Sequence, residues 1–175
     1  MLREEQIDLR RQRAKAARFR IENLGKKRVF SDYRVTNPES GGAYTVSVRG
    51  FDLGDNACTC PDFKANTLGT CKHIEAVLDT LKDDLPAHLQ KKKAAVTRPE
   101  ITLHYGEQLQ LQLHLPKRHS DKLKHLSQAF FDERPGHSRP VRRAHRRFLD
   151  QLLCFGDERR GLRVDEHVPQ RLHQN

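Results

Sequence analysis

The sequence predicts a small α+β fold, and three observations support this prediction. Residues 28–50 alternate apolar and polar side chains in a way that is typical of half-buried strands. Residues 58–73 bring three cysteines and a histidine close together in the chain. The segment that follows has one apolar stripe at helical spacing, made by Ile74, Val77, Leu78 and Leu81. We therefore expect a ββα unit, with flanking basic helices, an extra C-terminal β-hairpin and some disordered stretches.

Residues 1–27 are predicted to form a basic helix. Most residues before Gly25 are good helix formers, and neither Pro nor Gly interrupts them. A weak apolar stripe at Leu9, Ala17 and Ile21 runs beside a broad basic face. Gly25 is expected to end the helix. The basic face either lies against phosphates or is simply exposed to solvent.

Residues 28–82 are predicted to form a finger built on a hairpin. One strand lies around residues 29–36 and its partner around residues 44–48, with a loop rich in Asn, Pro, Ser and Gly between them. A two-stranded hairpin alone is marginal in water, so it needs a covering element. The helix with the apolar stripe supplies it, and Thr70 is its expected N-cap. Phe63 is expected to fill the core, with an exposed base-stacking role as the alternative.

The cysteines and the histidine form the centre of this finger. Cys58 and Cys60 are separated by one residue, as are Cys71 and His73, and ten residues lie between the two pairs. Residues i and i+2 of an extended segment project from the same face, so the first pair can aim at one ion. Three thiols and an imidazole are a full tetrahedral set for zinc, and they leave no coordination position for water. We predict one structural Zn²⁺, bound by Cys58, Cys60, Cys71 and His73, and no catalytic residues.

Three other interpretations of the cysteines stay open. A disulfide framework belongs to secreted proteins, whereas the start of the chain has no apolar signal-peptide core. A nucleophilic Cys71 with His73 as its base would leave the other two thiols unexplained. The third interpretation is chance spacing of buried thiols. Zinc accounts for the whole pattern, so we favour it.

The spacing and the residues around it resemble a SWIM zinc finger. The chain reads Cys-x-Cys, ten residues, then Cys-x-His, with Cys-Pro-Asp-Phe at residues 60–63 and Cys-Lys-His-Ile at residues 71–74. The resemblance covers roughly residues 28–82. It implies a ββα unit in which zinc joins a hairpin end to a helix start, and a role in binding DNA or protein without catalysis. By similarity to that family, the metal ligands are Cys58, Cys60, Cys71 and His73.

The same resemblance suggests a biological setting. Fingers of this kind occur beside bacterial Snf-type helicase-like ATPases, in plant transposase-related proteins and in partners of ubiquitin ligases. We therefore expect an accessory or N-terminal piece of a helicase-like ATPase system. The chain itself has no Gly-x-x-x-x-Gly-Lys-Ser/Thr phosphate loop, so the motor would have to come from elsewhere.

The remaining residues up to the tail are predicted to hold a linker and a second hairpin. Residues 83–100 combine two prolines with a lysine run, which is typical of a linker. Residues 101–131 are expected to form two strands that turn near Gly106, followed by a short helix over residues 120–131.

Residues 132–175 form an arginine-rich tail that differs from the rest of the chain. From Arg134 onward there are ten arginines and no lysine, whereas residues 1–133 contain eleven arginines and twelve lysines. A helix over residues 141–155 is expected, with arginines beside its apolar positions. The tail is either a nucleic-acid-binding segment or a frame-shifted, non-native continuation that is disordered.

Composition limits the function classes. The net charge is +10 with a pI near 9.8, which favours polyanionic partners, nucleic acid first. The alternative is a protein–protein interaction adaptor with no nucleic-acid contact. Apolar residues make up only 35% of the chain, so a small metal-stapled core is expected. The sequence contains no run of eighteen apolar residues, so it predicts no membrane span. We expect no small-molecule substrate, no enzymatic activity and a cytoplasmic location.

Overall fold

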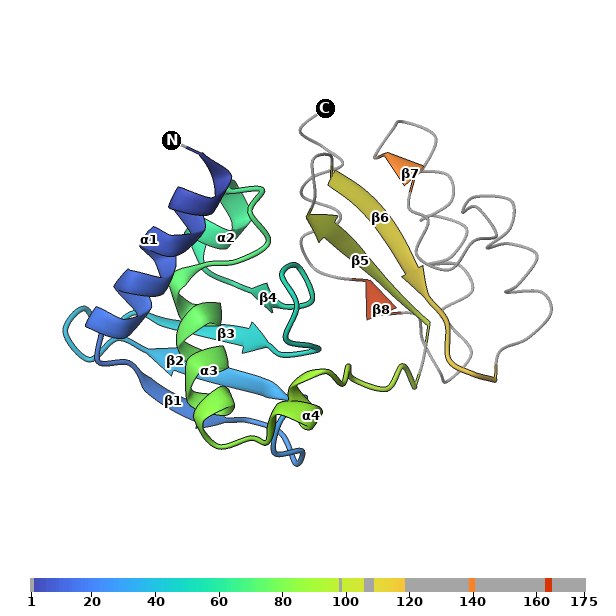
Figure 1. The fold of residues 1–175 in the computed structure, drawn as a ribbon, viewed down its shortest axis with the longest axis horizontal. Coiled ribbons are helices and arrows are strands. Elements are labelled where there is room, and N and C mark those ends of the chain that lie inside the picture. Colours follow the sequence, from blue (N-terminus) through green and yellow to red (C-terminus); the bar gives the residue numbers. More distant parts are fainter. Residues whose placement is uncertain (1, 98, 106–108, 119–138, 141–162, 165–175) are drawn as a thin grey trace. The chain divides into compact units, whose positions relative to one another are not determined.

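The computed structural model describes residues 2–97, 99–105, 109–118, 139–140 and 163–164 (Figure 1). It contains both helices and antiparallel strands, which confirms the predicted α+β class. The chain divides into two compact units, residues 1–94 and residues 95–175, and each is described by itself. Within the described ranges, every helix is too short or too polar to cross a bilayer.

The first unit is built on a four-stranded antiparallel sheet with the strand order β1-β2-β3-β4. Its strands are β1 (Arg20–Asn23), β2 (Asp32–Thr36), β3 (Ala43–Ser47) and β4 (Ala57–Cys58). The hairpin predicted from alternation is confirmed as β2 and β3, with Tyr33 opposite Val46 and Val35 opposite Tyr44. Alternate residues point to one face because the side chains of a strand alternate, and that face buries Val35 and Val46 completely.

The described residues of this unit also form four helices, one of which lies across a face of the sheet (Figure 1). They are α1 (Arg3–Ala16), α2 (Pro61–Ala65), α3 (Lys72–Asp83) and α4 (Ala87–Gln90). The predicted stripe on α3 is buried against the sheet, which confirms it as the covering helix. Phe63 of α2 is fully buried, as expected for a residue that fills the core.

The N-terminal helix is shorter than predicted. It ends at Ala16, and Ala17 is already extended, whereas the helical stripe had suggested an end at Gly25. Arg20–Asn23 forms β1 instead, with Ile21 opposite Val35 of β2. Helix propensity is a weak preference, and pairing with the open edge of β2 outweighs it here. The helix that remains packs along α3 and buries Ile7 and Ala14.

The short helix α2 and the N-cap of α3 were not predicted correctly. Strand β4 ends at Cys58, and Pro61 is the first residue of α2. The N-cap of α3 is Cys71, not Thr70. The Thr70 hydroxyl instead donates a hydrogen bond to the carboxylate of Glu75, one turn into the helix.

Part of the segment predicted as a linker is folded onto the first unit. It contains α4, and the backbone N–H of Ala94 donates to the carbonyl of Arg49 at 2.7 Å. The Lys93 ammonium lies 2.8 Å from Asp55 and 3.1 Å from Asp52. These carboxylates raise the pKa of Lys93, and the largest cause is the hydrogen bond that the Lys93 ammonium donates to Asp55. The division of the chain into five segments stays a prediction.

The second unit contains the predicted second hairpin. Its strands β5 (Glu100–Tyr105) and β6 (Leu109–His114) pair antiparallel, with Ile101 opposite Leu113. Two short strands extend this sheet, β7 (Arg139–Pro140) beside β6 and β8 (Arg163–Val164) parallel to β5.

Several expectations for the second half of the chain fall outside the described residues. These are the helices over residues 120–131 and 141–155 and, apart from β7 and β8, the arginine-rich tail of residues 132–175 with its expected disorder.

Candidate metal centre

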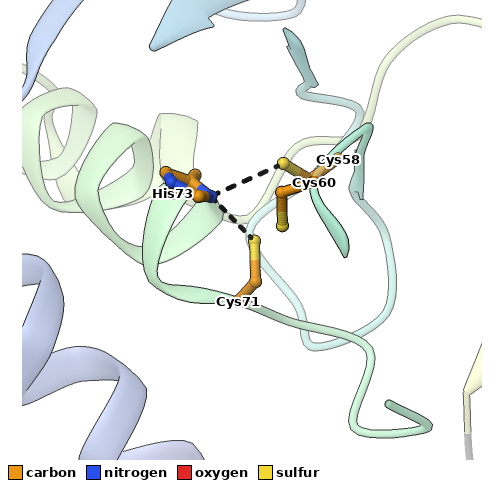
Figure 2. Close-up of side chains that lie close together, drawn as sticks. All are labelled: Cys58, Cys60, Cys71 and His73. Atoms are coloured by element: carbon orange, nitrogen blue, oxygen red, sulfur yellow. Dashed lines mark hydrogen bonds between the residues drawn. The ribbon is translucent and has the colours of Figure 1, made fainter. Parts of the chain in front are cut away.

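The structure brings together all four predicted ligand residues, from three different elements. Cys58 is the last residue of β4, Cys60 is the N-cap of α2, Cys71 is the N-cap of α3, and His73 lies in the first turn of α3. Their side chains point toward one another (Figure 2).

The distances between these side chains fit a single zinc ion. The candidate donor atoms all lie within 4.8 Å of one another. The Nδ1 atom of His73 is 3.9 Å from the Sγ atoms of Cys58 and Cys71 (Figure 2). Zinc with its usual bond lengths would place tetrahedral donors about 3.6 to 3.8 Å apart, so a small contraction closes the site. The Cys₃His set therefore fits one structural zinc ion.

Burial also points to a structural site. The four residues are at most 4% exposed. Three thiolates and one imidazole complete a tetrahedron, and such closed sites hold structure, whereas a catalytic zinc keeps a position open for water. The chemistry that these residues can support is thus metal coordination that fastens α2 and α3 to the end of β4.

Local hydrogen bonds position the first cysteine pair. Cys58 pairs with Val46 across β3 and β4, and this register turns its side chain toward the helices. The thiol sulfur of Cys60 accepts a hydrogen bond from the backbone N–H of Phe63 at 3.3 Å, which caps α2. Phe63 in turn is fixed in the core, so the position of Cys60 depends on core packing.

Asn66 holds the loop that joins the two ligand pairs. Its side-chain amide donates to the carbonyl of Asp62 at 2.7 Å and to that of Thr70 at 3.2 Å. Its side-chain oxygen accepts a hydrogen bond from the N–H of Leu68 at 2.8 Å. Gly69 follows with φ of 77°, a left-handed conformation that glycine adopts without strain. The amide of one residue therefore fixes both ends of the turn that leads to Cys71.

The three thiols strongly affect one another's ionisation. A hydrogen bond from Cys58 lowers the pKa of Cys60, and the same bond raises the pKa of Cys58 to about 12. Burial raises the pKa of Cys71. Zinc binding would displace the thiol protons, because cysteine binds the metal as a thiolate.

Two aromatic rings enclose the histidine. The ring of Phe19, just before β1, lies 5.1 Å from that of His73, and the ring of Tyr44 in β3 lies 4.9 Å from it. The ammonium of Lys72 sits 5.7 Å from the Phe19 centroid. Sequence reasoning placed Phe19 in a helix and missed this contact. The signal that was present is the alternation of charged and apolar residues over residues 18–22.

The comparisons with known proteins agree with this geometry. The family model of the SWIM zinc finger matches residues 44–82, which span β3, β4, α2 and most of α3. No curated protein and no solved structure gives a significant match to the chain. Helix α1 and strand β2 lie outside the matched segment but pack against it, and β1 pairs with β2. The match and the buried Cys₃His group together identify residues 44–82 as a SWIM zinc finger.

Proposed function

We propose that this protein is a non-catalytic, zinc-stabilised module that binds nucleic acid, DNA first. The observation that carries the proposal is an excess of cationic side chains on the first unit that have no carboxylate to pair with. Such an excess is the electrostatic footprint of a protein that neutralises phosphates.

Much of the negative charge in the first unit is already engaged in ion pairs. Asp62 pairs with Arg10 at 2.6 Å, and Glu75 pairs with Arg11 at 3.3 Å. The other engaged carboxylates are Asp8, Asp32, Asp52, Asp55 and Asp84. These contacts are internal to the unit, so the carboxylates in them do not neutralise the remaining cations.

The cations left over are numerous and mostly exposed. Among the described residues of the first unit, those with no carboxylate within ion-pair distance are Arg13, Lys15, Arg18, Arg20, Lys26, Lys27, Arg34, Lys64, Lys72, Lys82, Lys91 and Lys92. A surface of this kind attracts a polyanion through counterion release, without reading its sequence.

The proposal has two further parts, of which the first rests on the family resemblance. The module serves a helicase-like ATPase as an accessory piece, and the ATPase itself belongs either to another chain or to another part of a longer protein. We place the module in the cytoplasm, where reduced thiols remain available for zinc. Catalysis has no role in this proposal, because the four zinc donors leave no open coordination position.

Fluorescence anisotropy with a short labelled DNA duplex of mixed sequence tests the proposal. The zinc-loaded chain should bind at low salt, and log K should fall linearly with log salt concentration by about 0.9 for each phosphate contact. The assay should cover about 50 to 200 mM salt. Absence of binding at the lowest salt would overturn the proposal. A partner recovered by pull-down, with little salt dependence, would then favour the protein-interaction adaptor.

A further inference from the structure

One part of the cationic surface lies directly beside the zinc centre. Arg18 and Arg20 flank Phe19 at the entry to β1, and Lys72 approaches the ring of Phe19 from α3. We call Arg18, Arg20 and Lys72 the basic corner. No acidic residue occurs between residues 9 and 21, so the segment that carries Arg18 and Arg20 contains cations and no acid of its own.

Arg18 and Arg20 have no evident structural task. Both are exposed, and neither has a carboxylate partner among the described residues. By contrast, Arg13 and Lys15 lie in the last turn of α1, where a cation interacts favourably with the helix dipole. Glu22, the next acid along β1, stands opposite Arg34 in the strand register. The charges of Arg18 and Arg20 therefore remain available to a ligand.

Lys72 stands at a position where a cation is intrinsically unfavourable. It is the first residue of α3, and the N-terminal end of a helix dipole repels positive charge. Its contact with Phe19 is a cation–π interaction, which contributes about 0.5–1 kcal/mol at an exposed site. A second structural explanation is that Lys72 offsets the net negative charge of three thiolates on zinc. That explanation predicts an effect on zinc affinity, which can be measured separately.

A second group of lysines on the first unit serves for comparison with the basic corner. Lys26 and Lys27 lie in the loop after β1, beside Arg28, which pairs with Asp84 at 3.9 Å. Lys82 lies next to Asp83 and Asp84 at the end of α3. The surroundings of these lysines are mixed in charge, so they attract a polyanion less strongly than the basic corner does.

We propose that the basic corner holds the phosphate backbone of DNA, and that zinc keeps the corner in place through the contact of His73 with Phe19. This inference rests on the nucleic-acid binding proposed above and names the surface that carries it. Arg18 and Arg20 are connected to the zinc centre by the one residue between them. Loss of zinc would release His73, and the ring of Phe19 would then lose its support.

The experiment compares two variants of the full chain with equal loss of charge. The corner variant carries Arg18→Gln, Arg20→Gln and Lys72→Gln. The control variant carries Lys26→Gln, Lys27→Gln and Lys82→Gln. Each is titrated into the labelled duplex and into one of its single strands across the same salt series, after its zinc content is measured. The two DNA forms show whether the corner needs a double helix.

We expect the corner variant to bind DNA roughly tenfold more weakly or worse, with the salt slope reduced by about three. The control variant should stay within about twofold of the wild type. Equal weakening of the two variants, or greater weakening of the control, would overturn this inference while leaving nucleic-acid binding intact. If the wild type fails to bind either DNA form, the proposed function falls and the inference falls with it.

A third variant covers the case in which loss of Lys72 disturbs zinc binding. This double variant carries Arg18→Gln and Arg20→Gln and keeps Lys72 beside Cys71. Its matched control is a double variant with Lys26→Gln and Lys27→Gln. Weaker DNA binding by the Arg18/Arg20 double variant than by its control, at full zinc content, supports the proposed role of the basic corner. Equal affinities of the two double variants contradict it.

Discussion

The ring of Phe19 lies 5.1 Å from that of His73, and Tyr44 approaches the same imidazole to 4.9 Å. The histidine is therefore held between a residue inside the matched finger and a residue before it. Aromatic contacts of this kind contribute about 0.5–1.5 kcal/mol beyond area burial. The finger thus uses a segment outside residues 44–82 to cover its own metal site.

Replacing His73 with alanine should remove or weaken zinc binding. The imidazole supplies one of four donors in a buried site, and three thiols alone leave the tetrahedron incomplete. Native mass spectrometry of the reduced chain should show one zinc in the wild type and little in the variant, together with a weaker helical circular dichroism signal. His88→Ala is the matched control, because His88 is exposed on α4. Full zinc content in His73→Ala would remove the histidine from the ligand set.

Replacing Phe19 with leucine should weaken zinc binding without abolishing it. The substitution keeps apolar volume but removes the ring that contacts His73, at a cost of about 1 kcal/mol, or roughly fivefold in zinc affinity. Competition with a chromophoric chelator measures this change. Phe30→Leu is the control, because the Phe30 ring meets Phe51 at 6.4 Å. Equal losses in the two variants would show that Phe19 acts through general packing alone.

The parts of the fold that sequence predicts well are those with a local signature. The ligand spacing, the alternation in β2, β3, β5 and β6, and the stripe on α3 each follow a period that a few adjacent residues reveal. Phe63, three residues after Cys60, was correctly assigned to the core.

The parts that were missed depend on contacts between distant residues. The alternation over residues 18–22 is too short to decide between helix and strand, and residues 20–23 become a strand by pairing with the edge of β2. Helix α2 is five residues long and is stabilised by the Cys60 cap and the burial of Phe63, rather than by propensity. The position of Phe19 against His73 follows from the placement of β1, so it could not be predicted before that strand was known.

Chelation of zinc should unfold much of the first unit. Zinc connects β4, α2 and α3, and the apolar core around it is small, so metal binding supplies much of the folding free energy. We expect a strong chelator under reducing conditions to lower the helical signal, and added zinc to restore it. Magnesium is the control, because a site made of thiols and imidazole does not suit it. An unchanged spectrum in a chain shown to be free of metal would contradict a structural role for zinc.

Replacing Arg10 should loosen α1 from the finger. Its guanidinium donates two hydrogen bonds to Asp62, at 2.6 and 3.1 Å, and its side chain is only 13% exposed. Such paired, charge-assisted bonds are stronger than ordinary surface ion pairs, although the 40% exposure of the Asp62 side chain reduces their effect through screening by solvent.

We therefore expect Arg10→Gln to lower the free energy of unfolding by about 1 kcal/mol in urea denaturation of the zinc-loaded chain. Arg11→Gln is the control, because the side chain of Arg11 is 54% exposed and its ion pairs should contribute less than about 0.5 kcal/mol. Raised salt should leave the effect of Arg10→Gln nearly unchanged, since Arg10 is the more buried of the two arginines. If Arg11→Gln proves as destabilising as Arg10→Gln, α1 is held by the summed charge of its face, not by the bond between Arg10 and Asp62.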